Sequence, residues 1–277
     1  MGEAMYTRLL TFLFVMLASS GLGFGGDLSG KLTIQVSGRE QAIFEKAAVK
    51  FEKQNPRVRT RIVEPEGPDP LAAVKEGSVD IAVLGRTLAP EEKDYTATVV
   101  GWQGIAVMVN ASNRVGEVSL NHIVDVFSGK AKTWDELGGL ESRITVIGRE
   151  EGKGVRPYFE QLLGLNGTLV KGKSVLEPDK EAIKAVAGNL NAVSYLDLNV
   201  GLANVTVGVP IRLLSINKIE PEPANVSTGA YPLRRPITLV SKNPPSPITK
   251  AFMDFMLEKE GQKIVQEEEF VPLLVTK

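Results

Sequence analysis

The sequence predicts an α/β fold in which mostly parallel strands are joined by helical crossovers. Over residues 31–84, short apolar runs alternate with amphipathic stretches in the order strand, helix, strand, helix, strand. This order is typical of a parallel sheet covered by helices. The chain has 277 residues, of which 43% are hydrophobic and 23% charged, so one or two buried cores are expected.

The first half of the chain gives the clearest alternation. Glu40–Gln54 carries apolar residues at helical spacing and ends at Asn55-Pro56, as an amphipathic helix should. A second, short helix over Leu71–Glu76 is closed by Gly77. The strands expected around these helices are Lys31–Val36, Val58–Val63, Val79–Leu84 and Gly104–Asn110.

The second half continues the alternation with weaker signals. Ser119 is expected to cap a helix that runs to Phe127, and Pro247, after Ser246, suits the first position of a late helix. The proline-rich stretch 218–232 is interpreted as a connection. The other expected helices are 133–137, 158–163, 179–187 and 261–268, and the other strands are 144–147, 192–196 and 237–240.

The amino end has the features of an export signal. Arg8 precedes the apolar run Leu9–Ala18, and small residues follow. About ten apolar residues are too few to span a bilayer, which needs roughly 20, so residues 1–26 are predicted to be a cleaved signal peptide. The chain has no cysteine, which excludes disulfides and a lipid-modified N-terminal cysteine. We therefore expect a soluble periplasmic protein without a lipid anchor.

Charge and residue content exclude several functions. Thirty-two Lys and Arg against 33 Asp and Glu give a net charge of -1, so a nucleic acid is not expected as a partner. His122 is the sole histidine, and without a Ser-His or Cys-His pair no catalytic residue is assigned. We expect no enzyme activity, no cofactor and no metal site. Paired carboxylates leave an enzyme as a third, weaker hypothesis.

Long stretches of the chain resemble a known family. They are LTIQVSGREQA, EKQNPRV, EGSVDIAVLGRTLAPEE, GWQGIAVMVN, DVFSGKAKTWDELGG, ITVIGREEGKGVRPYFEQLLG, YPLRRPITLV and SPITKAFMDFMLEKEGQKIV with FVPL. On these stretches the chain resembles the phosphate-binding, periplasmic solute-binding proteins of ABC importers, in family order over nearly the whole mature chain.

The resemblance implies two α/β lobes joined by two crossovers, with the anion held in the cleft between them. One lobe would comprise residues 27–107 and 230–277, and the other residues 108–229. It also implies a monomer that closes by a hinge motion and delivers its ligand to an ABC permease of the inner membrane. Helix N-termini facing the cleft would donate backbone N–H groups to the anion.

The loop GREEGKGVR departs from the family pattern in part. Arg149 aligns with the arginine that the family uses to bind the anion, and Glu151 matches the acid that orients it. Lys153, Gly154 and Val155 stand where Ser-Gly-Thr is expected. Gly154 still allows backbone amides to approach an anion, but two hydroxyl donors are replaced by one ammonium.

The other aligned loops also lose hydroxyl groups. Ser37, Gly38 and Arg39 match a Ser-Ser-Thr-type turn, and Gly67 lies where a Gly-Ser-Gly turn begins a helix. Arg86 is retained after the third strand, but Gly85 stands where many phosphate binders have an aspartate.

These departures favour anion binding in general over phosphate specificity. Hydrogen bonds to charged groups contribute roughly 1.5–3 kcal/mol each, and a micromolar site needs about 8 kcal/mol. The leading hypothesis is a binding protein that captures a small, phosphate-like oxyanion for an ABC importer. The alternative is a sensory or interaction protein on the same fold, with weakened or altered ligand binding.

Overall fold

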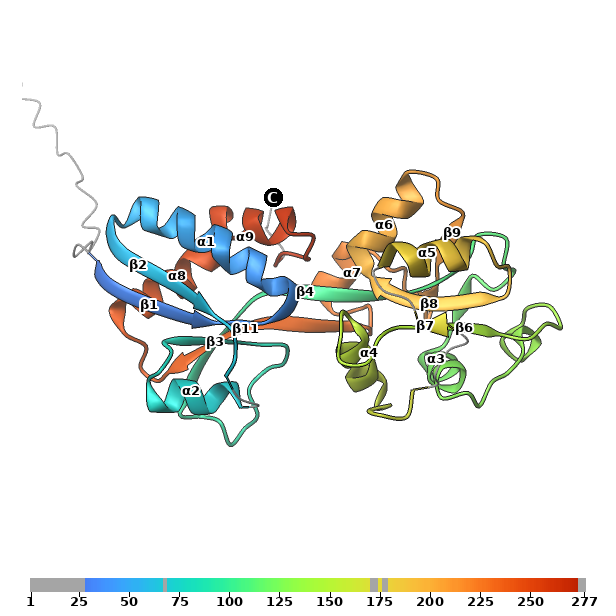
Figure 1. The fold of residues 1–277 in the computed structure, drawn as a ribbon, viewed down its shortest axis with the longest axis horizontal. Helices are drawn as coiled ribbons and strands as arrows, with labels where there is room; N and C mark the ends of the chain where they lie inside the picture. Colours follow the sequence, from blue (N-terminus) through green and yellow to red (C-terminus); the bar gives the residue numbers. More distant parts are fainter. Residues whose placement is uncertain (1–27, 67–68, 170–173, 176–178, 274–277) are drawn as a thin grey trace, which may run out of the picture.

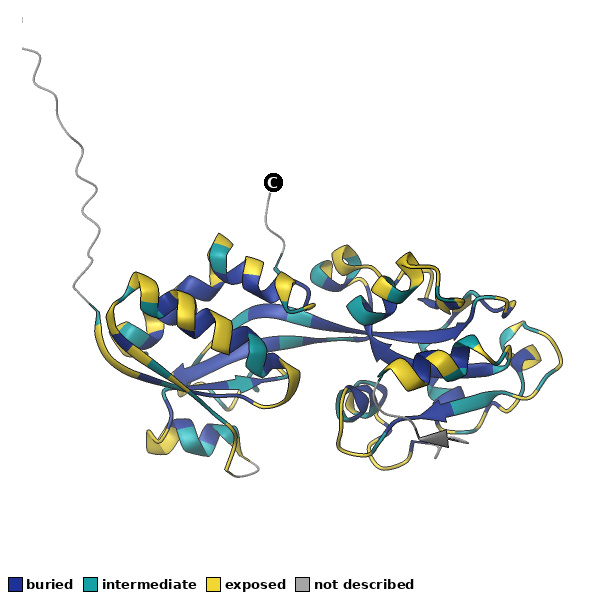
Figure 2. Cartoon of the chain, turned by 45° about the horizontal axis from the view of Figure 1, so that its top comes forward, coloured by how far each residue is buried: buried dark blue, intermediate teal, exposed yellow. Residues whose placement is uncertain are grey.

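The computed structural model describes residues 28–66, 69–169, 174–175 and 179–273. Two α/β lobes lie side by side and are joined by the strands β4 (Tyr95–Asn110) and β11 (Arg234–Lys242) (Figure 1). Both strands are buried over most of their length (Figure 2). The two-lobed α/β fold is confirmed, whereas the predicted signal peptide, residues 1–26, lies outside the described residues.

The first lobe is a sheet with helices on both faces. The helices α1, α8 and α9 cover one face, and α2 covers the other (Figure 1). The strand order is β2-β1-β3-β11-β4. The elements are β1 (Ser29–Gln35), a 3-10 turn η1 (Gly38–Glu40), α1 (Gln41–Gln54), β2 (Arg57–Val63), α2 (Pro70–Glu76), β3 (Ile81–Leu84), α8 (Pro247–Leu257) and α9 (Lys259–Glu267).

The core of this lobe explains why its helices form where they do. The apolar positions of α1 are buried, and Phe51 packs its ring 5.2 Å from Phe252 and 5.6 Å from Phe255 on α8. The hydroxyl of Ser246 accepts a hydrogen bond from the backbone N–H of Thr249 at 3.2 Å, so α8 begins with the predicted cap.

The second lobe continues the same sheet through β4, with β8 and β6 beyond it. Its core centres on stacked rings of Phe159 and Tyr195, 3.9 Å apart, with Phe127 and Trp134 also buried. The elements are β5 (Glu117–Val118), α3 (Leu120–Phe127), η2 (Trp134–Leu137), β6 (Thr145–Gly148), α4 (Arg156–Leu163), β7 (Ser174–Val175), α5 (Asp179–Ala187), β8 (Ala192–Asp197), α6 (Leu198–Thr206), β9 (Ile211–Leu213), β10 (Ser215–Ile216) and α7 (Pro223–Thr228).

Strand directions decide where loops can meet. β4 runs from the first lobe into the second, and β8 is antiparallel to it and parallel to β6. β11 runs antiparallel to β4, β3 antiparallel to β11, and β1 parallel to β3. The carboxyl ends of β1, β3, β6 and β8 therefore all point to the junction between the lobes. In open α/β sheets this edge is where ligands bind.

The structure corrects several element boundaries. β4 begins at Tyr95 rather than Gly104 because its first half pairs with β11 along the first lobe. The helix α6 was not predicted, and α7 lies inside the stretch interpreted as a connection. Extended backbone at Glu258 separates α8 from α9.

The two cores meet along the joining strands. On β4, Val100 packs in the core of the first lobe and Ile105 in that of the second. On the return path, Leu233 belongs to the second core and Ile237 to the first. The lobe boundaries near 107 and 230 lie close to these positions and stay predictions. No helix in the described ranges is long and apolar enough to cross a membrane.

Candidate functional site

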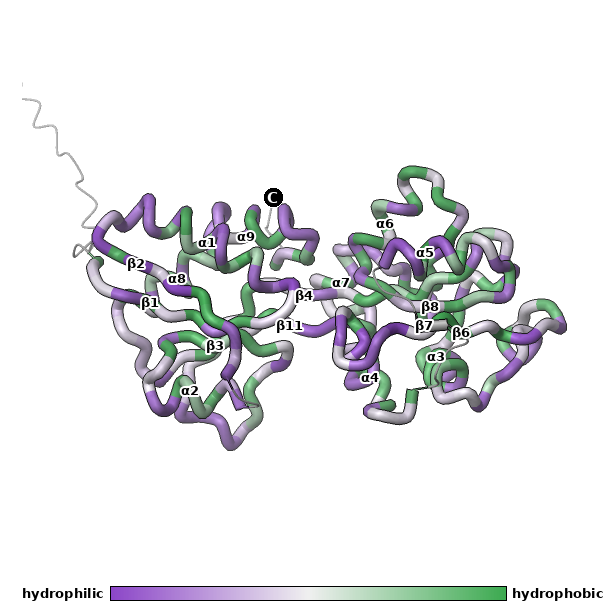
Figure 3. The backbone as a smooth tube through the Cα atoms, viewed as in Figure 1, coloured by the Kyte–Doolittle hydropathy of each residue, from purple (hydrophilic) through white to green (hydrophobic). Residues whose placement is uncertain are grey.

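The junction between the lobes gathers the loops that follow four parallel strands. The turn η1 follows β1, residues 85–86 follow β3, the Arg149 loop follows β6, and α6 follows β8 directly. The helices α1, α4 and α6 begin there, so their N-terminal N–H groups favour negative charge in this region. Where β11 begins, the chain turns hydrophilic (Figure 3).

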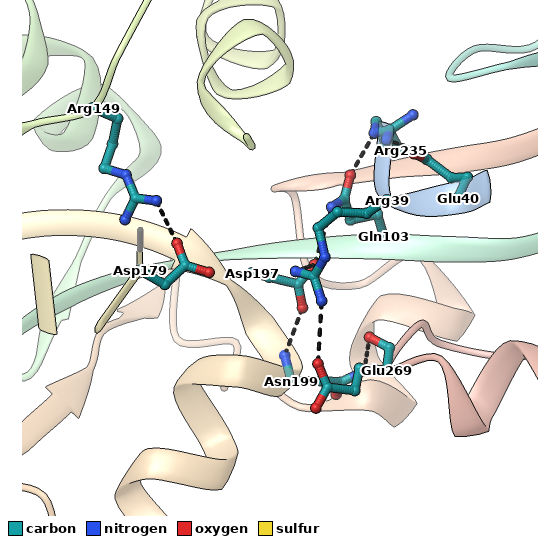
Figure 4. Close-up of polar contacts among 9 residues, drawn as sticks. All are labelled: Arg39, Glu40, Gln103, Arg149, Asp179, Asp197, Asn199, Arg235 and Glu269. Atoms are coloured by element: carbon teal, nitrogen blue, oxygen red, sulfur yellow. Dashed lines mark hydrogen bonds and ion pairs between the residues drawn. The ribbon is translucent and has the colours of Figure 1, made fainter. Parts of the chain in front are cut away.

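A row of polar side chains crosses the sheet at this junction. Arg235 on β11 lies opposite Gln103 on β4 in the strand register, and its Nε donates to Gln103 Oε1 at 2.6 Å. Gln103 Nε2 donates to Asp197 Oδ2, at the end of β8, at 3.0 Å. Arg39 and Glu40 of η1 complete the row (Figure 4). We refer to these five residues, together with Tyr158 of α4, as the junction cluster.

Arg235 is the best-held cation of the junction cluster. Its residue surface is only 5% exposed, its Nη2 pairs with Glu40, and its guanidinium lies over the Tyr158 ring at 3.4 Å. Burial raises the pKa of Tyr158, against the nearby positive charge of Arg235, so the ring stays a neutral phenol. Within the described part of the chain, Nη1 of Arg235 has no hydrogen-bond partner. Among the residues that the structure describes, this nitrogen is therefore an unused donor.

The place of Nη1 explains a departure noted in the sequence. A Cβ atom at position 85 would overlap with Nη1 of Arg235, so the guanidinium occupies the space that a side chain would need. Glycine at position 85, where the resemblance led to the expectation of an aspartate, therefore leaves room for the Arg235 guanidinium. The exchange replaces a potential negative charge with a positive one.

Asp197 links the cluster to the second lobe. It is 2% exposed, caps α6 by accepting from Asn199 N at 3.1 Å, and lies 3.6 Å from Nη1 of Arg39. Burial raises the pKa of the Asp197 carboxyl, and the charge of Arg39 opposes that rise. Asn199 Nδ2 also donates to the carbonyl of Glu269 at 2.8 Å. The two lobes are therefore in polar contact on this side of the joining strands.

Arg149 is buried in the second lobe and pairs with an acid at the start of a helix. The residue is 2% exposed, its Nη2 pairs with Asp179 at the start of α5, and its carbonyl accepts from Arg156 Nη1 at 2.7 Å. Glu151 is exposed in the following turn. Asp179 lies 30 residues from Arg149 in the sequence, and the orienting role assigned to Glu151 stays a prediction. Figure 4 shows this pair apart from Arg235.

The three other predicted cations also contact acids, and each is partly exposed. Arg86 makes two bonds of 2.7 Å to one carboxylate, and this pairing lowers the pKa of Glu92 to about 2. The pairs are Arg39 with Glu269 at 3.1 Å, Arg86 with Glu92 at 2.7 Å, and Lys153 with Glu150 at 2.5 Å. As ligand-binding residues, these three cations stay predictions.

The remaining predicted residues are mostly backbone positions. Gly38 and Gly154 have φ of 70° and 57°, which suits glycine and turns the chain sharply beside the junction. The Ser37 hydroxyl makes no hydrogen bond within the described residues and is exposed. Val155 is buried in the core of the second lobe, and Gly67 lies outside the described residues.

A hollow of about 500 Å³ beside η1 is a poor place for an anion. Gly38 and Arg39 line it, but so do four glutamates of α1 and the end of α9, namely Glu45, Glu267, Glu268 and Glu269. Their charge would repel an oxyanion. We therefore place the candidate site at Arg235 and the carboxyl ends of the strands.

Arg235, Gln103, Glu40 and Asp197 were not predicted as site residues. The Arg-Arg-Pro sequence before the strand at 237–240 was visible, but two adjacent arginines on a strand point to opposite faces. Arg234 stacks on Trp102 at 3.8 Å, whereas Arg235 points into the junction. Only the register of β11 against β4 shows which of the two is buried in the site.

A two-lobed α/β protein with a buried, partly unused guanidinium between its lobes belongs to the class of bilobal binding proteins. Residues 25–260 match the sequence model of the PBP superfamily domain, and the chain belongs to this periplasmic-binding-protein superfamily.

The chain is 29% identical to the phosphate-binding protein PstS of Bacillus subtilis over 256 residues, which cover 88% of this chain and 81% of that protein. PstS from Borrelia burgdorferi has a similar fold, with a TM-score of 0.80 at 18% identity over 88% of this chain and 99% of that one. A Clostridium perfringens structure, assigned to the substrate-binding proteins of phosphate ABC transporters and containing phosphate, gives a TM-score of 0.63 at 27% identity over 88% and 100% of the two chains.

Proposed function

We propose that this protein binds a small oxyanion, phosphate first among the candidates, between its lobes and delivers it to an ABC permease. The observation that carries the proposal is Arg235, a nearly fully buried guanidinium whose Nη1 has no partner in the described residues and faces Gly85. The names of the relatives, which describe phosphate binding, support the same ligand class.

The geometry supplies the kinds of contact that an oxyanion needs. Arg235 offers N–H groups from a residue that is only 5% exposed, and a charge-assisted hydrogen bond is stronger at such a position than in bulk solvent. The hydroxyl of Ser37 and the loop amides around Gly38 lie at the end of β1. Arg149 belongs to the opposite lobe, so closure of the lobes would bring a second guanidinium to the ligand.

We infer an exported, monomeric receptor that holds its ligand without changing it. The sole histidine, His122, has a structural contact: its Nδ1 accepts from the backbone N–H of Ser119 at 3.4 Å in the capping box of α3.

Isothermal titration calorimetry of the purified mature chain tests the function directly. Phosphate, sulfate, molybdate and small carboxylates are titrated into the wild type and into Arg235→Ala. We expect saturable binding of at least one anion, and a loss of at least tenfold in affinity in the variant. If the folded wild type and the Glu40 variants described below all show no heat with any anion, the proposed function is wrong. Unchanged affinity in Arg235→Ala would reject the placement of the site.

A further inference from the structure

Glu40 is a buried carboxylate inside the candidate anion site. It is 4% exposed, forms the last residue of η1, and pairs with Nη2 of Arg235. Its other oxygen, Oε2, lies toward Gly38, 3.5 Å from the position that a Cβ atom there would take. A buried carboxylate is costly unless it is paired, so this ion pair is what allows Glu40 to lie there.

The nitrogen atoms of the Arg235 guanidinium differ in how many protein contacts they make. Nε is bound to Gln103 and one face is covered by Tyr158, so an oxyanion could approach in the bidentate manner only along the Nη1–Nη2 edge. Nη1 has no partner among the described residues, but Nη2 is held by Glu40. Nη2 carries two N–H groups, so an oxyanion on this edge would share Nη2 with the protein's own carboxylate and lie beside its negative charge.

Glu40 lies at the start of a helix and beside a buried arginine, two features that favour a bound anion. Glu40 precedes Gln41, the first residue of α1, and its side chain makes no capping hydrogen bond to that helix. Glu40 thus lies in the chain between the Gly38 turn and the N-terminus of a 14-residue helix, and its carboxylate pairs with the buried Arg235.

We propose that Glu40 is an internal anion that competes with the ligand for Arg235 and so lowers the affinity of the site for anions. The proposal rests on the function proposed above. An oxyanion on the Nη1–Nη2 edge would share Nη2 with the Glu40 carboxylate and be repelled by its charge. The site therefore binds anions more weakly than Arg235 alone would allow.

A role for Glu40 in orienting Arg235 predicts the opposite change in ligand affinity when Glu40 is replaced. If Glu40 only orients Arg235, its removal leaves the guanidinium loose and weakens binding. If Glu40 competes, its removal frees Nη2 while Gln103 and Tyr158 still hold the guanidinium in place. The direction of the change in affinity therefore separates the two roles.

The experiment compares phosphate and sulfate affinities of the wild type, Glu40→Gln and Glu40→Asp by calorimetry at pH 7. Glu45→Gln is the matched control, because it removes the same charge from an exposed position of α1 that is bonded to Gln41 at 2.7 Å. Thermal unfolding of each variant checks that it is folded. We expect at least tenfold tighter binding in Glu40→Gln, a smaller gain in Glu40→Asp, whose carboxylate is one methylene shorter, and less than a threefold change in the control.

Each other result has a distinct meaning. Weaker or equal binding in Glu40→Gln overturns the inference but leaves the proposed function standing. Equal gains in Glu40→Gln and Glu45→Gln overturn it as well, because net charge alone would then explain the effect. Binding by Glu40→Gln with none by the wild type supports it strongly. If Glu40→Gln is unfolded, Glu40→Asp decides by the same sign. No binding by any folded variant rejects the inference together with the proposed function.

Discussion

Arg149 and Arg235 are both buried arginines, one in each lobe, and they differ in how they are held. Arg149 is 2% exposed and pairs with Asp179, whose side chain keeps 26% of its surface exposed. Arg235 is 5% exposed and pairs with Glu40, whose side chain keeps only 5%. The Arg149–Asp179 pair is partly exposed to solvent, whereas both partners of the Arg235–Glu40 pair are buried. We therefore expect the two arginines to contribute differently to the free energy of unfolding.

The largest expected effect is on stability when each arginine is removed. Arg235→Ala leaves the Glu40 carboxylate buried without its partner, which typically costs about 3–5 kcal/mol of unfolding free energy. Arg149→Ala leaves Asp179 able to reach water, so we expect a loss of about 1–3 kcal/mol. Urea unfolding monitored by circular dichroism measures both.

Two further variants sharpen this comparison. Lys153→Ala removes an exposed cation and is expected to change stability by less than about 0.5 kcal/mol. In the double variant Glu40→Ala with Arg235→Ala, part of the lost stability should return because no unpaired charge remains. Equal losses for Arg149→Ala and Arg235→Ala would show that the difference in burial does not govern the two pairs.

The contrast also explains what the sequence could and could not predict. Arg149 follows directly on a strand in a loop that resembles the family's, so its position is readable from nearby residues. The partners of Arg235 lie 132 and 195 residues away in Gln103 and Glu40, and no local pattern connects them. Register between β4 and β11 creates the junction cluster, and register depends on the tertiary fold.

In the fold too, features set by neighbouring residues were predicted, whereas features set by tertiary pairing were not. Local capping chemistry predicted the starts of α3 at Ser119 and α8 at Ser246, and both side chains accept the expected hydrogen bonds. The early start of β4 at Tyr95 depends on its pairing with β11, which the residues 95–103 do not show by themselves. The six-residue helix α7 is too short to give a periodic signal and depends on packing, with Val226 buried against the second core.

A second prediction concerns the space that Arg235 takes from residue 85. Gly85→Ala adds a methyl group where Nη1 lies, and the guanidinium is held by Glu40 and Gln103, so it cannot move away freely. We expect a loss of about 1–3 kcal/mol, as for other overpacked sites. In an Arg235→Ala background the added methyl group should cost almost nothing.

Gly188→Ala is the control for this prediction. Position 188 has no positive φ, and a Cβ atom there meets its first neighbour, the Lys184 carbonyl, at 3.4 Å, an acceptable contact. Its stability should change by less than about 0.5 kcal/mol. If Gly85→Ala costs the same with and without Arg235, the guanidinium is not the group that excludes a side chain from position 85.

The smallest expected effect is on the pH dependence of stability, and it concerns Asp197, the end of the polar row that starts at Arg235. Burial raises the pKa of Asp197 above its ordinary value of 3.8, so the folded protein binds this proton more tightly than the unfolded chain. The stability that the protonated form contributes is fully present below pH 3.8 and is lost as the pH rises through the folded pKa. Asp197→Asn should remove this loss while retaining a cap for α6, since asparagine caps helices well.

Urea unfolding of the wild type and Asp197→Asn between pH 3.5 and 7 measures the difference. The wild type should lose about 1 kcal/mol relative to the variant as the pH rises, the size of a typical point substitution. Glu92→Gln provides the opposite sign, because Arg86 lowers the pKa of Glu92 to about 2, so its contribution is lost only as the pH falls below 4.5 toward that value. If the difference in unfolding free energy between wild type and Asp197→Asn stays constant from pH 3.5 to 7, Gln103 and Arg39 fully offset the effect of burial on the Asp197 carboxyl. The buried side of the comparison would then carry no net pH dependence.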